Sequence, residues 1–310
     1  MATAANIALG KKVAAYAAFC LASFGIGIYL TFPYDIVRQR ITAEASAGGA
    51  YVKVASLGPG LFGITATGVE LSRKMEANED KAPTPLKVDS IAVRPSLFPL
   101  GVAVRAKLLQ GTAHLGLGLV GDLKVRVNLD GLDLQSENLK AFSGLALGGK
   151  ASAQLALDIP KVSPSKTAPA EPELAQANGS ASLDVADLQV NGGTVTVPMY
   201  GQPTPMDLPK VAVGDLDAKI KFEKGLGTLD AFHAKSNELE LLISGTLKLA
   251  KRFDYSELAL LLKLKAQPEL TKRLGMIAAG LSMLEADKDN PDFRVAHVTG
   301  FLGRPNFSPR

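Results

Sequence analysis

Residues 123–134 read LKVRVNLDGLDL, and this short stretch indicates the fold class of the chain. Aliphatic and polar residues alternate along its first eight positions: Leu123, Val125, Val127 and Leu129 are interleaved with Lys124, Arg126, Asn128 and Asp130. Because successive side chains of a β-strand point to opposite faces, the stretch predicts a strand with one apolar and one solvated face.

The same alternation recurs along most of the chain after residue 50. Further aliphatic rows run through residues 102–108, 216–222, 239–249 and 258–264. Many alternating strands separated by glycines favour an antiparallel sheet, in which one face packs and the other meets water. We therefore expect a mostly β protein.

The alternation slips by one residue at three similar places. Segments 66–71 (ATGVEL) and 129–134 (LDGLDL) contain a glycine at the slip, whereas 185–190 (VADLQV) has the same shape without one. A slip turns the apolar row to the other face unless a bulge or corner takes up the extra residue. The three slips indicate a faintly repeated building block.

Three segments are expected to interrupt the strands. Residues 75–85 (MEANEDKAPTP) are typical of a polar loop, and Asn191-Gly192 is typical of a tight hairpin. Residues 159–179 are rich in Pro, Ala and charge, which favours a flexible insertion. The insertion separates a first β half, 51–158, from a second, 180–310, and the two halves form either one sheet or two domains.

Helix is expected at one late segment, residues 268–286. Its apolar residues fall on one stripe, and Pro268 suits the first turn of a helix: Leu270, Leu274, Ile277, Leu281 and Leu284 form the stripe. We expect this helix to cap or line the open edge of the sheet, which needs cover against strand addition.

The N-terminal region predicts a membrane anchor. Residues 13–32 (VAAYAAFCLASFGIGIYLTF) contain no charge, and twenty helical residues span about 30 Å, the thickness of the hydrocarbon core. A cleaved signal peptide is the alternative, but its apolar core would be shorter and a small-residue site would follow closely. Lys11 and Lys12 favour a cytoplasmic tail at 1–12, with a juxtamembrane segment at 33–50 that lies on the membrane or forms a stalk.

Composition excludes several classes of function. The chain has 34 basic and 30 acidic residues, no Trp, and no basic stripe interleaved with aromatics, so nucleic-acid binding is not expected. The single cysteine, Cys20, lies inside the apolar segment and excludes a disulfide framework.

No constellation of residues predicts catalysis, a cofactor or a metal. His114, His233 and His297 are far apart in sequence, and the letters Gly116-x-Gly118-x-x-Gly121 open no expected helix, as a dinucleotide loop requires. Four carboxylates fall on expected solvated strand faces, away from any recognisable pocket: Asp187, Asp215, Asp217 and Glu240. We expect no catalytic, cofactor-binding or metal-binding residues, and no enzyme.

Three stretches carry a resemblance to a known family. They are the anchor running into Phe32-Pro33-Tyr34-Asp35, the segment 88–100 (VDSIAVRPSLFPL), and the ending 298–305 (VTGFLGRP). Together with the layout, they resemble the type II secretion system protein GspN in its myxobacterial and related form, and more loosely the AsmA-like repeat proteins. The resemblance implies an N-terminal transmembrane helix followed by an elongated, folded-over antiparallel β-sheet with one or two short helices.

Two functions follow from the resemblance. The first is a non-enzymatic, single-pass component of type II secretion, N-terminus inside, with its periplasmic sheet contacting other secretion subunits. The alternative is an AsmA-like lipid-binding or lipid-transfer protein, in which phospholipid lies in a groove lined by rows such as Val125, Val127, Ile220 and Leu260. A closed core on that face would exclude the alternative.

Overall fold

The computed structural model describes residues 19, 23, 27, 31–47, 50–60, 63–73, 84–97, 100–163, 170–199 and 202–308. The expected tail at 1–12 and nearly all of the expected anchor at 13–32 lie outside these residues. Within the described part, no helix is both long enough and apolar enough to span a bilayer.

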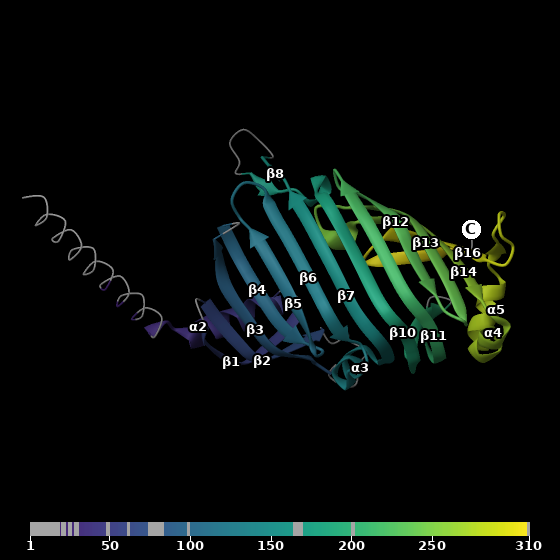
Figure 1. Ribbon diagram of the computed structural model, residues 1–310, viewed down its shortest axis with the longest axis horizontal. Helices are drawn as coiled ribbons and strands as arrows, with labels where there is room; N and C mark the ends of the chain where they lie inside the picture. The colour runs from purple at the N-terminus through teal and green to yellow at the C-terminus, as the bar shows by residue number, and fades with distance from the viewer. Residues whose placement is uncertain are drawn as a thin grey trace, which may run out of the picture.

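Fifteen strands form one antiparallel sheet, ordered β1-β2-β3-β4-β5-β6-β7-β10-β11-β12-β13-β14-β16-β15, with β17 also pairing with β16 (Figure 1). The strands are β1 Ala50–Gly60, β2 Gly63–Arg73, β3 Leu86–Leu97, β4 Leu100–Leu108, β5 Gly111–Gly118, β6 Leu123–Asp133, β7 Leu145–Ile159, β10 Asn178–Met199, β11 Gln202–Glu223, β12 Leu226–Lys235, β13 Leu239–Lys248, β14 Glu257–Ala266, β15 Glu285–Ala286, β16 Arg294–Phe301 and β17 Arg304–Ser308. The mostly β, antiparallel prediction is therefore confirmed.

The aliphatic rows predicted from the sequence lie opposite one another on adjacent strands. Val127 of β6 pairs with Leu115 of β5 and Leu155 of β7, and Ala181 of β10 pairs with Leu155 and with Ile220 of β11. Side chains opposite one another on the same face stabilise adjacent strands. One apolar face thus runs unbroken across the centre of the sheet.

The three slips are real and have one local cause. Gly68, Gly131 and Asp187 have φ values of 60°, 61° and 51°, in the left-handed region. In each case two exposed residues follow one another before the apolar row resumes on the same face. Register shifts at Leu129/Leu132 and Val185/Leu188 mark the extra residue as a bulge, as the sequence predicts.

The prediction of a tight hairpin at Asn191-Gly192 is wrong. β10 runs through this dipeptide as one strand, and its partner β11 is equally long. Gly192 and Gly193 have φ values of 107° and 147°, and the ladder with β7 shifts register between Val190 and Gly193. The glycines accommodate an irregularity within a long strand rather than a reversal of the chain.

The described residues of segment 159–179 form short regular elements. Ile159 ends β7, short strands β8 (Lys161–Val162) and β9 (Glu171–Pro172) pair with each other, and the 3-10 helix η1 (Leu174–Gln176) leads into β10. Residues 164–169 lie outside the described part. Because β7 pairs directly with β10, the sheet continues from one β half to the other.

The single helix expected at 268–286 is interrupted. Helices α4 (Pro268–Leu274) and α5 (Met276–Ser282) are separated by Gly275, whose φ is 54°, and residues 285–286 form β15. Pro268 occupies the first turn of α4, as predicted. The helices follow β14, and the outer strands β16, β15 and β17 lie beyond it, so α4 does not cap the sheet edge.

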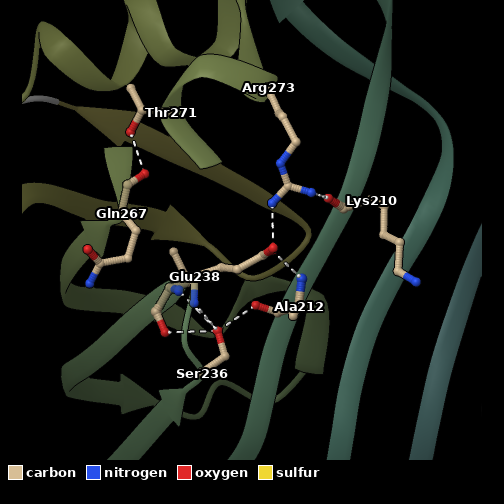
Figure 2. Close-up of polar contacts among 8 residues, drawn as sticks. Lys210, Ala212, Ser236, Glu238, Gln267, Thr271 and Arg273 are labelled. Carbon is tan, nitrogen blue, oxygen red and sulfur yellow. Dashed lines mark hydrogen bonds and ion pairs between the residues drawn. The ribbon is translucent and has the colours of Figure 1, made fainter. Parts of the chain in front are cut away.

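Helix α4 instead covers the adjoining ends of β12 and β13 and contacts the middle of the longer strand β11. Arg273 Nη2 lies 2.6 Å from a carboxylate oxygen of Glu238, in the β12–β13 turn, and Arg273 Nη1 donates to the Lys210 carbonyl of β11 at 2.8 Å (Figure 2). Glu238 also accepts the Ala212 backbone N–H at 3.0 Å. The turn is closed by Ser236, whose hydroxyl donates to the Ala212 carbonyl at 2.7 Å.

Helix α3 (Glu137–Ser143) covers the same end of the sheet farther along. It contacts β7 and also β3, and Asn138 exchanges two hydrogen bonds of 2.9 and 2.7 Å with the Lys87 backbone. In a flat sheet β3 and β7 would lie about 19 Å apart, whereas seven helical residues span about 10 Å. The contacts therefore fit a curved sheet, whose outer strands pass behind the central ones in Figure 1.

Helix α2 (Tyr34–Ala47) lies against the first edge strand, β1. Arg38 donates a 3.2 Å hydrogen bond to the Ala55 carbonyl, 17 residues later, so the helix folds back antiparallel to β1. The segment predicted to follow the anchor is therefore helical over residues 34–47, and it covers an edge that could otherwise pair with another chain.

Candidate binding surfaces

The apolar face of the sheet is incompletely covered. In β6 the aliphatic row alternates half-buried residues with exposed polar ones. Around Leu157, Ile159 and Phe222, which are buried, the neighbouring apolar side chains are only partly buried: Leu123, Val125, Leu155, Ala181, Ile220 and Leu247. Leucine, isoleucine and valine side chains are normally among the most buried, so a broad half-exposed apolar face is a candidate surface for a ligand or partner.

The residues expected to line a lipid groove are all on this face. Val125 and Ile220 pack against the buried cluster, and Val127 and Leu260 are half-buried in β6 and β14. Leu260 pairs with Gly245 of β13 and Val298 of β16, so it belongs to the same curved sheet several strands away. The side chains are thus neither fully enclosed nor fully exposed.

A hollow of about 900 Å³ lies on the opposite, polar face. Two cross-strand rows line it, and their side chains point away from the apolar face. One row contains Ala103, Gly116, Arg126, Ala156, Ser180 and Lys221, and the other contains Arg105, His114, Asn128, Gln154, Ser182 and Lys219. Small residues form the floor between long charged ones. A twisted sheet is saddle-shaped, so each face can be concave along one diagonal.

The hollow is lined mainly by cations, most of which already have partners. Its charged lining comprises Arg94, Arg105, Arg126, Lys219 and Lys221 with a single carboxylate, Asp230. Arg126 pairs with Asp158 at 2.8 Å, Lys219 with Asp217 at 3.4 Å, and Lys221 with Glu223 at 2.7 Å. Within the described chain, no carboxylate pairs with Arg94 or Arg105, so these two arginines carry the uncompensated charge.

A row of acids borders the hollow on the same face. Asp184 of β10 lies opposite Ser152 of β7 and Asp217 of β11, and Asp130 lies in the nearby β6 bulge between Leu129 and Leu132. A hydrogen bond shared with the directly opposite Asp217 raises the pKa of Asp184, and partial burial and the charge of Asp217 raise it further. Like charges placed directly opposite each other destabilise a strand pair.

The histidines remain apart. His114 lines the hollow, where its Nδ1 lies 3.4 Å from Arg105 Nε; exposed His233 lies 3.4 Å from Glu240; His297 is exposed on β16. Of the other carboxylates singled out in the sequence, Asp215 accepts the Asp187 backbone N–H at 3.0 Å. Among the described residues, no group of three or more His, Cys, Asp or Glu side chains could hold a metal.

The dinucleotide-like letters at 116–121 also lack the required context. Gly116 and Gly118 are in β5, and the chain then turns into β6 rather than into a helix. A phosphate loop of this kind needs backbone N–H groups at a helix N-terminus.

The second edge of the sheet is poorly suited to strand addition. β17 is five residues long and contains Pro305, which has no N–H to offer a partner strand. Since α2 lies along β1, both edges are protected in ways that natural sheets use against edge-to-edge association. The broad faces are the larger candidate surfaces.

These features define a class of protein: one large, open, antiparallel β-sheet with an apolar face and a charged face, capped by helices at one end. Comparison of the chain with protein-family models, with curated proteins and with solved structures finds no match.

Sequence reasoning did not identify the hollow. The lining residues alternate correctly with the apolar row, but nothing in one strand reveals that small residues on neighbouring strands fall opposite one another. Gly116, Ala156 and Ser180 become one floor only when the register of four strands is known. The only indication of the hollow in the sequence is that small residues occupy corresponding positions in successive strands.

Proposed function

We propose that the chain is a non-enzymatic component of the type II secretion system, attached to the inner membrane by residues 13–32 with its sheet in the periplasm. The observation that carries the proposal is a single continuous sheet whose two broad faces remain accessible while its two edges are protected. Such a sheet is suited to contact with other proteins. The sequence resemblance to GspN supports the choice of secretion machinery.

The polar face is the proposed contact for other subunits. Arg94 and Arg105 supply uncompensated positive charge at one end of the hollow, and the paired charges of Arg126 and Lys219 lie farther across it, on β6 and β11. Complementary charge on a partner would direct association and fix its orientation. An acidic segment of another secretion subunit is the matching chemistry.

Gene deletion tests the function. In the deletion strain, secreted enzymes should accumulate in the periplasm, and the wild-type gene should restore their release. The double variant Arg94→Glu, Arg105→Glu should restore less release, whereas Lys107→Glu, on the same face outside the hollow lining, should behave like wild type. Normal secretion in the deletion strain contradicts the proposal.

Lipid binding is the second candidate, because the apolar face is broad and only half-buried. Helices α3 and α4 cover one end of the strands and leave the face itself accessible. Mass spectrometry of protein purified in mild detergent should then detect phospholipid, and Val127→Asn with Leu155→Asn should reduce it. Protein purified without any associated phospholipid counts against this function.

A further inference from the structure

Among the residues whose side chains the structure describes, the two ends of the sheet differ in how much apolar surface they expose. Because the strands form a meander, alternate turns lie at the same end. Helices α3, α4 and α5 follow strands β6 and β14 and therefore occupy one end, whereas the β1–β2, β3–β4, β5–β6, β13–β14 and β16–β17 turns occupy the other. We call the second end the apolar rim.

Four aliphatic side chains form the first part of the rim. Leu97 and Leu100 pair across the β3–β4 turn and are 70% and 55% exposed, while Leu119 and Val120, in the β5–β6 turn, are 52% and 68% exposed. The Leu119 N–H donates to the Leu100 carbonyl at 3.0 Å, so the two turns are adjacent. Contiguous exposed apolar side chains mark an interaction surface.

Aromatic side chains form the second part of the rim. Phe253 and Tyr255 belong to the 3-10 helix η2 (Phe253–Tyr255) between β13 and β14, and Phe301 ends β16. The Tyr255 and Phe301 ring centroids are 5.9 Å apart, and all three side chains are about half exposed or more. Aliphatic and aromatic residues at turn tips suit the boundary between lipid headgroups and acyl chains.

Helix α2 connects this rim to the proposed anchor. Ala47 lies near the start of β1, and Arg38 reaches Ala55 farther along the strand, so Tyr34 is at the end of β1 that leads to the β1–β2 turn. The uncharged segment 13–32 joins the described chain immediately before this point. The chain therefore arrives at the rim from the direction of the proposed membrane segment.

We infer that the apolar rim rests on the outer leaflet of the membrane that holds the anchor, with Leu97, Leu100, Leu119 and Val120 inserted among the lipids. The inference rests on the membrane attachment in the proposed function. Two ion pairs lie at this end of the sheet, Arg252 with Asp254 at 2.7 Å and Lys251 with Glu171 of β9 at 3.5 Å. The proposed contact relies on the exposed apolar side chains, so its ligand is the apolar–polar boundary of a bilayer.

Fluorescence of the full-length chain in phosphatidylcholine vesicles tests the inference. Cys20→Ser removes the only native thiol, and Leu119→Cys then carries an environment-sensitive fluorophore. Met283→Cys provides the matched control, because Met283 is apolar, 79% exposed and directly follows α5 at the helix-covered end. Nitroxide-labelled lipid should quench the probe at 119 several-fold more than the probe at 283, at low and high salt.

Substitutions in the rim and the other quenching results separate the rim contact from the anchor. Replacing Leu97 and Leu100 with Asn should reduce quenching at position 119 while the chain stays in the vesicle fraction. Equal quenching at 119 and 283 in vesicle-bound chain overturns the rim contact but leaves the anchor intact. A chain that does not reconstitute into vesicles overturns both, and a rim probe shielded in cells yet unquenched by lipid assigns the rim to a protein partner.

Discussion

Arg273 and Glu238 form a 2.6 Å ion pair that joins helix α4 to the turn between β12 and β13 (Figure 2). The same carboxylate accepts the Ala212 N–H of β11, so one side chain connects three elements that are far apart in the sequence. The junction covers one end of an otherwise open sheet.

Replacing Glu238 with Gln should lower stability and alter its pH dependence. The hydrogen bond from Ala212, and secondarily Arg273, lowers the pKa of Glu238 below its ordinary 4.5. A carboxyl group whose pKa is lower in the folded than in the unfolded protein stabilises the fold at pH values above its unfolded-state pKa. This stabilisation is lost as the pH falls through the folded-state pKa. We expect a loss of about 1 kcal/mol at pH 7, since the pair is partly exposed. Urea unfolding of the wild-type protein and the variant at pH 7 and pH 3.5 measures both effects. An equal loss of unfolding free energy at the two pH values would contradict the predicted pH dependence.

Leu270→Ala should destabilise the helix-covered end of the sheet. Leu270 is 1% exposed, in the first turn of α4, and removing a fully buried leucine side chain typically costs about 2–5 kcal/mol. Met283→Ala, at the exposed residue that directly follows α5, is the control and should change the unfolding midpoint little. Similar midpoints for the two variants would show that α4 does not pack as described.

Asp184→Asn should raise stability at neutral pH. The shared hydrogen bond with Asp217 raises the folded-state pKa of Asp184, so the wild-type protein gains stability as the pH falls through that raised value. The variant removes the repulsion and should be more stable by about 0.5 kcal/mol at pH 7, a small effect because solvent screens the exposed pair. The advantage should shrink in acid. Asp130→Asn, on the same face opposite Thr112 of β5, is the control and should gain less.

The bulges at Gly131 and Asp187 predict opposite effects of substitutions to and from glycine. Asp187→Gly should stabilise the protein by about 0.5–1 kcal/mol, because glycine adopts a φ of 51° without a Cβ penalty. Gly131→Ala should cost about 1 kcal/mol although a Cβ there meets nothing within 4 Å, since only backbone strain opposes it. Thermal unfolding of the two variants measures both changes in stability. A Gly131→Ala variant that is more stable than the wild-type protein would refute the left-handed backbone at the bulge.

The strands were predictable because their determinants are local. Alternation in 123–130 and 258–264 identifies β6 and β14, and the slip at Gly131 identifies a bulge, without knowledge of neighbouring strands. Asn191-Gly192 was misread because a glycine pair permits either a turn or an irregular strand, and pairing with β7 and β11 decides between them. The helix break at Gly275 and the hollow depend on tertiary register and lay beyond local patterns.

The most direct test of the account is what the chain binds in its own envelope. The full-length protein, crosslinked in living cells and purified through an affinity tag, should carry other type II secretion subunits in amounts comparable to itself. Arg94→Glu with Arg105→Glu should lower their yield, and Lys107→Glu should not. Recovery without any secretion subunit, from cells that secrete normally, would contradict the central claim.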